Sequence, residues 1–483
     1  MQPLVILRII GLLLMVFSTT VIPSIGISLW YHDPELITFL NAFLVILIGG
    51  FIIWWPVKDC HRELRIRDGF IVVVLFWFVF GLVGSLPLYL SESLNANFTD
   101  ALFESISALT TTGATVFTGL DDLPPSILYY RQQLQWLGGM GIIVLAVAVL
   151  PMLGIGGMQL YRAETPGPVK DNKLTPRITE TAKALWYIYL GLTIACTLAY
   201  WLAGMTPFDA LGHSFSTVAI GGFSTHDASI GYFDNQMIEI IASFFMLMAG
   251  VNFALHFSAL RSYSLKPYFF DIEFRVYISM LAIASAISVL YLYFTNTFNS
   301  WGDALHHGIF QTISIGTTAG FTTAEYYNWP GFLPVMLLFL SFVGGCAGST
   351  GGGMKVVRVI LLFKQGLREI FRLIHPNAQI PVKIGGKVMP ENVSNAIWGF
   401  FALYVASFSV MMLLLMASGL DQVTAFSALA ACLNNLGPGL GEVGANYQGI
   451  NDFSKWVLCF AMLLGRLEIF TLLVILTPSF WRR

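Results

Sequence analysis

The chain contains 483 residues, of which 56% are hydrophobic and 11% are charged, and its formal net charge at pH 7 is −2. Soluble domains carry about 25% charged residues, so this composition excludes an ordinary water-facing surface. Apolar runs near 20 residues recur along the chain, and each is long enough to cross a hydrocarbon core of roughly 30 Å as a helix. The sequence therefore predicts an all-α polytopic membrane protein, and no nucleic-acid partner is expected.

Apolar stretches bounded by polar clusters predict ten transmembrane helices. They lie near residues 4–28, 36–56, 69–91, 127–155, 184–204, 236–260, 274–294, 331–363, 395–418 and 455–477. The first has no small-residue cleavage site, so we interpret it as an uncleaved span and not as a signal peptide. Four shorter, half-polar helical segments are too short to span the membrane. These lie near residues 100–112, 209–220, 304–318 and 424–435.

Basic residues alternate with the predicted spans. The loops after the second, fourth, sixth and eighth spans, together with the chain ends, hold 22 of the 25 Lys and Arg residues. The opposite loops hold none, so the positive-inside rule places both termini in the cytoplasm. If the four short segments crossed as well, this alternation would be lost, so we expect them to re-enter and return to the outer side.

The outer loops carry carboxylates instead, and a mouth with one sign of charge raises the local concentration of cations. Ordinary solvated loops would give the same composition, so this alternative stays open. The carboxylates are Asp33, Glu35, Asp121, Asp122, Asp227, Asp234, Glu325, Glu442 and Asp452.

The four short segments resemble one another, which indicates an internal repeat. They read "DALFESISALTTTGATVF" from Asp100, "DALGHSFSTVAIGGFST" from Asp209, "DALHHGIFQTISIGTTAGFTT" from Asp303 and "TAFSALAACLNNLGPGL" from Thr424. In three of them a glycine follows the first residue by 13 positions, whereas in the third the interval is 17. The third unit therefore has four extra residues, or its aspartate is not the equivalent one.

The repeated pattern has a direct physical interpretation. A half-length helix that enters from outside points its partly negative C-terminal end at the middle of the membrane. The chain then returns in extended form, and a glycine allows a positive φ or a close approach of backbones. Such backbone is tolerated only where protein buries it or where it lines a water-filled path. Four such loops around one axis would present a ring of carbonyl oxygens to a dehydrated cation.

Over its full length the chain resembles the Trk/Ktr/HKT superfamily of potassium transporters, and within it the TrkH/TrkG subunits. The motifs that carry this resemblance are "TTTGAT" (110–115), "AIGGFSTHDASIGYF" (219–233), "TTAGFTT" (317–323), "NNLGPGLG" (434–441), "GGCAGSTGGG" (344–353) and "GRLEIFTLL" (465–473). The resemblance implies an extra N-terminal helix pair and four pseudo-symmetric membrane–pore–membrane repeats around one pore. The expected ranges are 1–68 for the pair and 69–160, 180–264, 270–366 and 390–483 for the repeats.

The resemblance also implies that K⁺ is the transported ion and that a selectivity filter of backbone carbonyls holds it. The filter glycines would be Gly113, Gly222, Gly320 and Gly437. The carbonyls just before them would belong to Thr111, Thr112, Ile220, Gly221, Thr318, Ala319, Asn435 and Leu436. In relatives that favour Na⁺ the first glycine is often serine, so four glycines favour K⁺. No metal site other than these carbonyls is expected.

The eighth predicted span is interrupted by "VGGCAGSTGGGMKVVR" (343–358), although each glycine costs roughly 1 kcal/mol in a helix relative to alanine. The resemblance implies that this stretch is the gate. Its residues are Gly344, Gly345, Gly348, Ser349, Thr350, Gly351, Gly352 and Gly353. A phosphate-binding loop is excluded because Met354 and then Lys355 follow Gly353. Helix packing through small residues remains the alternative.

Arg466 lies close to the middle of the last predicted span, where a charge costs roughly 2.5–3.5 kcal/mol on insertion scales. The resemblance implies that it belongs to the gate and opposes K⁺ passage. Glu468 is only two residues away and points to another face of a helix. The alternative is a buried ion pair with a carboxylate of another helix, such as Glu104 or Glu239.

The leading hypothesis is potassium uptake through a gated, channel-like pore, and the alternative is K⁺/H⁺ or K⁺/Na⁺ symport. A membrane-embedded enzyme is discounted, because the histidines of the short segments show no metal-ligand spacing, and we expect them to support the filter. They are His213, His306 and His307. The five cysteines show no CxxC spacing, so we expect free thiols.

No nucleotide site is expected in this chain. The resemblance implies a cytosolic nucleotide-binding RCK-type subunit, similar to TrkA, and a homodimer in the lipid of a bacterial inner membrane. The basic loops 161–183 and 365–392 are long enough to dock such a subunit, although positive-inside charge alone would also explain them.

Overall fold

The computed structural model describes residues 2–60, 66–148, 178–385, 387–389, 391–467 and 469–482. The first half of the described chain forms α1 (Pro3–Ser18), α2 (Ile22–Tyr31), α3 (Leu36–Trp54), α4 (Ile66–Gly84), α5 (Leu86–Leu90), α6 (Phe98–Leu109), α7 (Pro125–Ala148), α9 (Ile178–Leu202), α10 (Pro207–Ala219), α11 (Gln236–Ala249) and α12 (Phe253–Ser262). The second half forms α13 (Lys266–Phe270), α14 (Ile272–Phe294), α15 (Trp301–Gly316), α16 (Leu333–Val343), α17 (Val356–Ile374), α18 (Glu391–Ala417), α19 (Gln422–Leu433), α20 (Asp452–Arg466), α21 (Phe470–Leu476) and α22 (Pro478–Trp481).

Six helical stretches of the described chain are long and apolar enough to cross a membrane, or eight if each of two bent helix pairs is counted as one crossing. Of the two other expected spans, 127–155 lies in α7 up to Ala148 and its remainder lies outside the described residues, and 331–363 is split into α16 and α17. The number of ten crossings therefore stays a prediction.

The two bent pairs are departures from the expected straight spans. Between α11 and α12 the axis turns by 94°, and between α20 and α21 it turns by 116°. At the first break the Asn252 side chain accepts a hydrogen bond from Ala254 N at 2.8 Å and so begins α12 as a separate helix. The second break comes directly after Arg466.

The four predicted short helices are confirmed as α6, α10, α15 and α19, with bounds within three residues of those expected. The expected loop 365–392 is partly wrong, because α17 continues to Ile374 and an antiparallel pair, β1 (Lys383–Ile384) and β2 (Lys387–Val388), follows. This short pair is also a minor exception to the expected all-α class. The expected docking loop 161–183 and the end of the first repeat lie largely outside the described residues.

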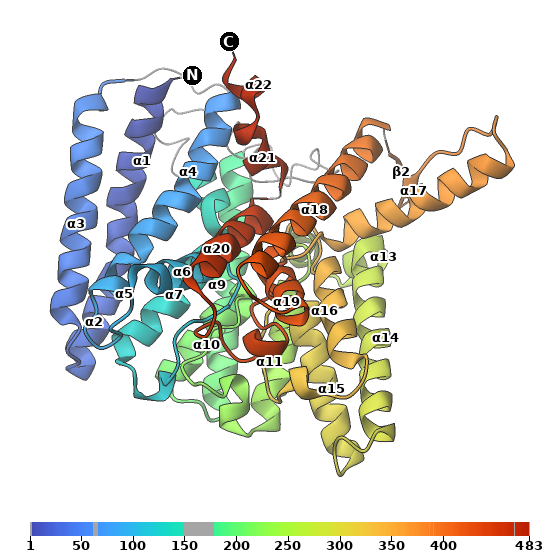
Figure 1. The fold of residues 1–483 in the computed structure, drawn as a ribbon, viewed down its shortest axis with the longest axis horizontal. Coiled ribbons are helices and arrows are strands. Elements are labelled where there is room, and N and C mark those ends of the chain that lie inside the picture. The colour runs from blue at the N-terminus through green and yellow to red at the C-terminus, as the bar shows by residue number, and fades with distance from the viewer. Residues whose placement is uncertain are drawn as a thin grey trace.

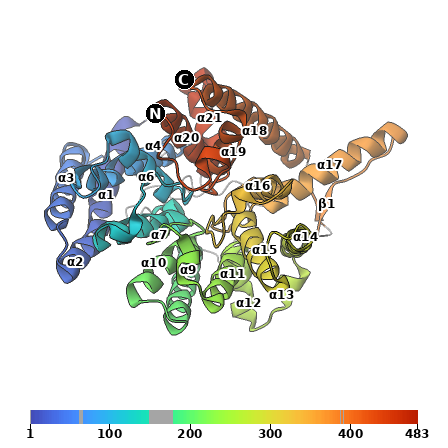
Figure 2. The ribbon, with the colours of Figure 1, turned by 60° about the horizontal axis from the view of Figure 1, so that its bottom comes forward.

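The helices are arranged around a central axis, as Figure 2 shows by the colour order, which runs from blue through green and yellow to red. The end of the chain thereby returns to its beginning, since α20 packs on α6 and α21 packs on α4. Figure 1 places both termini on the same side of the molecule, with α17 extending away from the helical body. An even number of crossings agrees with this placement.

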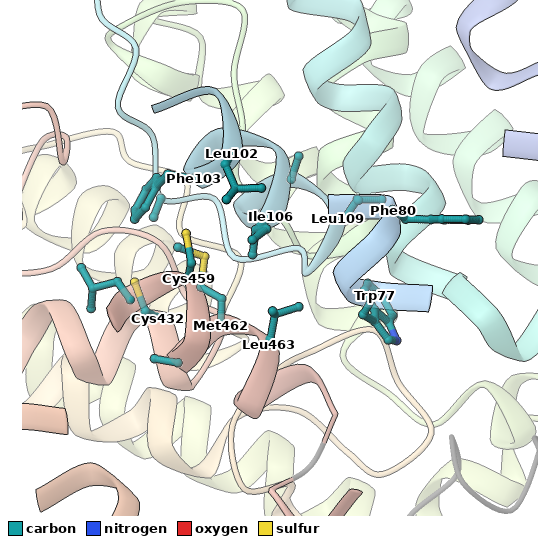
Figure 3. Close-up of a cluster of buried hydrophobic side chains, with 14 of the residues drawn as sticks. Trp77, Phe80, Leu102, Phe103, Ile106, Leu109, Cys432, Cys459, Met462 and Leu463 are labelled. Carbon is teal, nitrogen blue, oxygen red and sulfur yellow. The ribbon is translucent and has the colours of Figure 1, made fainter. Parts of the chain in front are cut away.

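The helix α6 illustrates how the short helices are held inside the molecule. All of its residues from Ala101 to Leu109 are buried, and Figure 3 shows its apolar side chains between those of α4 and α20. A helix buried on every face is not an amphipathic surface helix. Its polar groups therefore need partners, and Ser105 Oγ donates to Gly81 O at 2.8 Å.

Candidate functional site

The four short helices begin with the same N-terminal cap. A side-chain oxygen of the residue before each helix accepts a hydrogen bond from the backbone N–H three positions later. The four pairs are Asn97 with Asp100, Thr206 with Asp209, Ser300 with Asp303 and Asp421 with Thr424. The repeated aspartates are thus equivalent. The third helix has 16 residues where the others have 12 or 13, so its four extra residues add one helical turn.

The four helices also end in the same way, in segments that we call the glycine turns (residues 110–113, 219–222, 317–320 and 434–437). In each turn a residue other than glycine has a positive φ, and a glycine with positive φ follows two positions later. The first members are Thr111 (φ 55°), Ile220 (55°), Thr318 (70°) and Asn435 (53°), and the glycines are Gly113 (81°), Gly222 (77°), Gly320 (81°) and Gly437 (96°).

One further hydrogen bond is common to all four turns. The N–H of the residue between these two positions donates to a carbonyl five residues earlier, always at 2.8 Å, in the pairs Thr112–Ser107, Gly221–Ser216, Ala319–Ser314 and Leu436–Ala431. A β-branched residue with positive φ is an outlier that costs of order 1–3 kcal/mol and persists only where its surroundings fix it. Three of the four first members are β-branched, so the turns are held under strain.

The glycine turns close into a ring. A Cβ atom on each glycine would collide with a carbonyl oxygen of the next turn, so no side chain fits at these positions. The contacts join Gly113 to Gly221 O, Gly222 to Ala319 O, Gly320 to Leu436 O and Gly437 to Thr112 O. The ring therefore runs once through all four turns in chain order and returns to the first.

All four glycines of the ring also line one cavity of about 360 Å³. The acidic, basic and histidine side chains at its wall are Arg131, His226, Asp227 and Glu325. The structure thus brings together every sequence-predicted filter residue, because the eight residues before the glycines belong to the same turns.

Buried polar side chains hold the chain where it leaves each turn, and most of them were missed by the sequence analysis. Gln135 donates to Gly221 O at 2.7 Å and accepts from Phe223 N at 3.1 Å. Tyr447 OH donates to Gly437 O at 2.7 Å, and Ser314 Oγ donates to Phe321 O at 2.6 Å. The polar run "RQQLQ" (131–135) inside an apolar stretch was the signal that could have identified the glutamine.

Of the three histidines expected to support the filter, two contact residues just after the ring. His213 Nε2 lies 2.9 Å from Ser224 Oγ, and His307 Nδ1 lies 3.0 Å from Thr323 Oγ1. His306 pairs instead with Glu239. The carboxylate of Glu239 is therefore engaged away from Arg466.

Glu104 is engaged as well, in a buried ion pair with Arg131 at 2.6 Å. Both side chains are almost fully buried, at 0% and 1% exposure. The two alternative partners that the sequence suggested for Arg466 are thus both paired with other residues. Glu104 also accepts from Val116 N at 2.9 Å, so the pair fixes the chain after the first glycine turn.

Arg466 is the last residue of α20 and lies beside the first glycine turn. Its guanidinium donates to the carbonyl oxygens of Gly138 and Gly139, and Nη1 lies 3.5 Å from Thr111 Oγ1. Its Cζ is 5.5 Å from the centre of the Trp77 ring. The C-terminal end of a helix also favours a cation.

The segment between α16 and α17, which we call the broken-span loop (residues 344–355), contacts three of the glycine turns or their helices. Thr350 Oγ1 donates to Val218 O at 2.9 Å, at the end of α10. Gly352 N donates to Thr318 Oγ1 at 2.7 Å, and Gly353 N donates to Asn434 O at 3.0 Å. Together with the contact of Arg466 to the first turn, the residues that the sequence assigned to a gate contact the first, third and fourth turns and the helix that ends in the second turn.

The cysteines carry no metal chemistry. All five are free, and four are buried. Across the described residues no group of three or more His, Cys, Asp or Glu side chains could hold a metal ion. The carbonyl-rich ring is therefore the candidate site of the described chain.

Near the cavity, His226 links the outer segments that follow the first two turns. Its Nδ1 contacts Asp121, and its Nε2 lies 3.6 Å from Asp209 Oδ1. Burial lowers the pKa of His226, but the hydrogen bonds and negative charges of Asp209 and Asp121 more than offset this effect, so its pKa lies above 6.5.

This raised pKa predicts a pH-dependent stability. The ion pairs contribute fully below pH 6.5, where the histidine of the unfolded chain is also charged, and their contribution is lost as the pH rises through the folded-state pKa. We expect His226→Gln to lower the melting temperature at pH 6, where it should cost less than about 1 kcal/mol of stability. At a pH above the folded-state pKa of His226, the same substitution should leave the melting temperature unchanged. Thermal unfolding in detergent measures this, with exposed His375→Gln as control. Equal effects at both pH values would contradict it.

Comparison with known proteins agrees with this architecture. The model of the TrkH family, described as "Cation transport protein", matches residues 36–482. Trk system potassium uptake proteins TrkH from Vibrio parahaemolyticus and Escherichia coli are 58% and 56% identical, over 99% of both chains in each case. The Escherichia coli protein TrkG is 42% identical over 99% of this chain and 98% of its own.

A solved structure is similar over the whole chain. The crystal structure of the potassium transporter TrkH from Vibrio parahaemolyticus superposes with a TM-score of 0.91, at 56% identity and with 100% of both chains covered. The resemblance inferred from the motifs is thus confirmed. This chain belongs to the TrkH family of cation transport proteins, and it is a transporter and not an enzyme.

Proposed function

We propose that this chain takes up potassium ions across a bacterial inner membrane through one gated pore, with the ring of glycine turns as its selectivity filter. The observation that carries the proposal is the closed ring, in which four backbone turns of one conformation meet around one axis. A K⁺ ion loses its hydration shell where several carbonyl oxygens replace it. The printed names of the TrkH relatives, which are potassium uptake proteins, support the same ion.

In this proposal the ion binds carbonyls of the eight residues that precede the four glycines. One of these groups has a further partner, since Gln135 donates to Gly221 O, and Tyr447 donates to the carbonyl of the filter glycine Gly437 itself. A carbonyl oxygen has two lone pairs, so such a hydrogen bond still leaves one for the ion. The hydrogen bonds hold the oxygens in position, which disfavours collapse around a smaller ion.

The gate is proposed to consist of the broken-span loop and Arg466. Support comes from their contacts with the first, third and fourth glycine turns and with Val218, directly before the second turn. A loop that is bonded to Thr318 and Asn434 occupies the space next to the ring, and Arg466 adds a positive charge beside Thr111. Both features would hinder a cation until they move.

The remaining parts of the proposal concern topology and assembly. We propose both termini in the cytoplasm, four repeats with the ranges given above, and a homodimer with one pore in each protomer. The relatives are named as parts of Trk systems, so we also propose a partner, a cytosolic nucleotide-binding RCK-type subunit similar to TrkA. The exposed basic part of α17, with Arg372, is available for docking in the described chain.

Flux of K⁺ through the purified protein in sealed liposomes tests the proposed function. We expect passive K⁺ uptake without a proton or sodium gradient, and about a 30-fold increase in the resting flux of Arg466→Ala, since a unit charge several ångströms from the ion opposes it by about 2 kcal/mol at an effective dielectric constant of about 20. Deletion of residues 351–353 should also raise the flux, because it removes both donors to the third and fourth turns.

The matched control is Arg466→Lys, which keeps the charge but not the forked geometry of the guanidinium. It should resemble the parent protein more closely than Arg466→Ala does. If K⁺ enters only when a proton or sodium gradient is imposed, the channel mechanism is wrong and K⁺/H⁺ or K⁺/Na⁺ symport replaces it.

A further inference from the structure

Glu273 is a buried carboxylate that the proposed pore does not yet use. It is the second residue of α14 and is 8% exposed. Its Oε1 accepts a hydrogen bond from Ala347 N at 2.7 Å and another from Val357 N at 3.1 Å. These two donors flank the segment 348–356, so one oxygen atom of a distant helix binds the broken-span loop at Ala347 and α17 at Val357, just beyond the loop.

The chemistry of this contact differs from that of the other contacts of the loop described above. Towards the glycine turns the loop uses neutral hydrogen bonds, for example from Gly352 N to Thr318 Oγ1. Glu273 instead supplies a single carboxyl oxygen that accepts two backbone N–H groups in a buried place, where a lost hydrogen bond leaves its donor without a partner. Val357 lies in the first turn of α17, where the N-terminal end of the helix dipole also favours a negative charge.

The position of Glu273 connects the loop to the side of the protein that carries basic residues. The short helix α13 ends at Phe270, and α14 begins two residues later. Phe269 and Phe270 are largely exposed, at 68% and 80%. The exposed helix α13 is thus joined directly to the start of α14, which carries the carboxylate that binds the loop.

We propose that Glu273 is a positioning residue that holds the broken-span loop closed, and that its release frees the loop to open. The proposal rests on the proposed function, because it takes this loop as the gate. While the carboxylate stays in place, Ala347 and Val357 are both bound to one atom and cannot separate. Only the glycine-rich middle can then move, and that part is bonded to the turns.

The native Cys346 reports directly on this state. It lies in the loop beside Ala347, is 1% exposed, and is a free thiol. Its backbone N donates to Gly250 O at 2.9 Å, which fixes it against the end of α11. A closed loop protects this thiol from a water-soluble maleimide, and an opened loop exposes it. Mass spectrometry can localise the label to this cysteine among the five.

The experiment compares Glu273→Gln and Glu273→Leu with the control Asp452→Asn, which neutralises an exposed carboxylate in the first turn of another helix, α20. We expect Glu273→Gln to increase both the labelling rate of Cys346 and the basal K⁺ flux by up to about tenfold, because the amide brings two N–H donors of its own to a place where Ala347 and Val357 both need an acceptor. Glu273→Leu should increase them further, and Asp452→Asn should change neither. The K⁺/Na⁺ selectivity should stay constant throughout.

The outcomes separate this proposal from the proposed function. Faster labelling with unchanged flux would support the role of Glu273 but would overturn the loop as gate. Unchanged labelling in both Glu273 variants, with the monodisperse elution of the parent protein, would overturn the role of Glu273. Faster labelling together with a lost K⁺/Na⁺ preference would also overturn it, because Glu273 would then support the whole pore and not the closed loop alone.

Discussion

Replacing Gly222 by alanine is expected to reduce K⁺ flux by at least about 100-fold, because strain and collision together cost several kcal/mol at a site that must keep its geometry. Gly222 has a φ of 77°, and its added Cβ would collide with the carbonyl oxygen of Ala319 in the next glycine turn. The carbonyl must rotate or the two turns must separate. Either change opens the ring, so we also expect the remaining flux to lose its preference for K⁺ over Na⁺ in the liposome assay.

The matched control is Gly119→Ala. Gly119 has a similar φ of 69°, but its added Cβ would meet no atom within 4 Å. The control therefore carries the strain of a left-handed residue, roughly 1–2 kcal/mol, without the collision. It should keep most of the flux and all of the selectivity. Equal effects of the two substitutions, or an unchanged K⁺/Na⁺ ratio in Gly222→Ala, would show that the ring is not the filter.

The positions of the short helices could be predicted because their signals are local. Three such signals can be recognised along the chain. They are an oxygen-bearing side chain that caps the third residue of each helix, an apolar segment too short to cross the membrane, and a glycine at a fixed interval. Asp303 shows the limit of this approach. Its interval to Gly320 left two interpretations open, and only the observed cap at Ser300 shows that the helix has an extra turn.

The bends were missed although one of them left a local signal. Asn252 follows Gly250 inside an apolar run and caps a new helix, which is a recognisable start. The bend after Arg466 has no such signal, because it depends on what the guanidinium binds. Those partners are the carbonyls of Gly138 and Gly139 on α7, more than 300 positions away in the chain.

The closure of the ring could not be predicted from the sequence for the same reason. Asn435 Nδ2 donates to Thr112 Oγ1 at 2.9 Å, and this bond joins the fourth glycine turn to the first across 323 positions. Periodicity and composition carry no information about such pairs. The sequence predicts four equivalent turns, whereas their meeting around one axis depends on how the helices pack.

The contribution of this packing to stability can be measured at the buried ion pair of Glu104 and Arg131. Arg131 also donates to Thr115 Oγ1 at 3.1 Å, stacks 4.3 Å from the ring of Phe223, and its Nη1 lies 3.4 Å from Ser224 O. One guanidinium therefore connects the residues after the first glycine turn to those after the second. Loss of either partner should loosen two neighbouring turns at once.

Glu104→Gln keeps the shape of the side chain but leaves the Arg131 charge uncompensated in a buried place, which destabilises a protein by about 3–5 kcal/mol. We expect a large decrease in the thermal inactivation temperature, together with weaker K⁺/Na⁺ discrimination. The double variant Glu104→Gln, Arg131→Met should recover much of the stability, because it leaves no buried charge. It should not recover the discrimination, because the link between the turns stays broken.

The control is Asp100→Asn, which removes the partner of Lys455 from the same helix at a more exposed position (22%) and should have a smaller effect. If the double variant is no more stable than Glu104→Gln, the cost lies in the lost hydrogen bonds to Thr115 and Val116 and not in the unpaired charge, and the first glycine turn depends on the carboxylate alone.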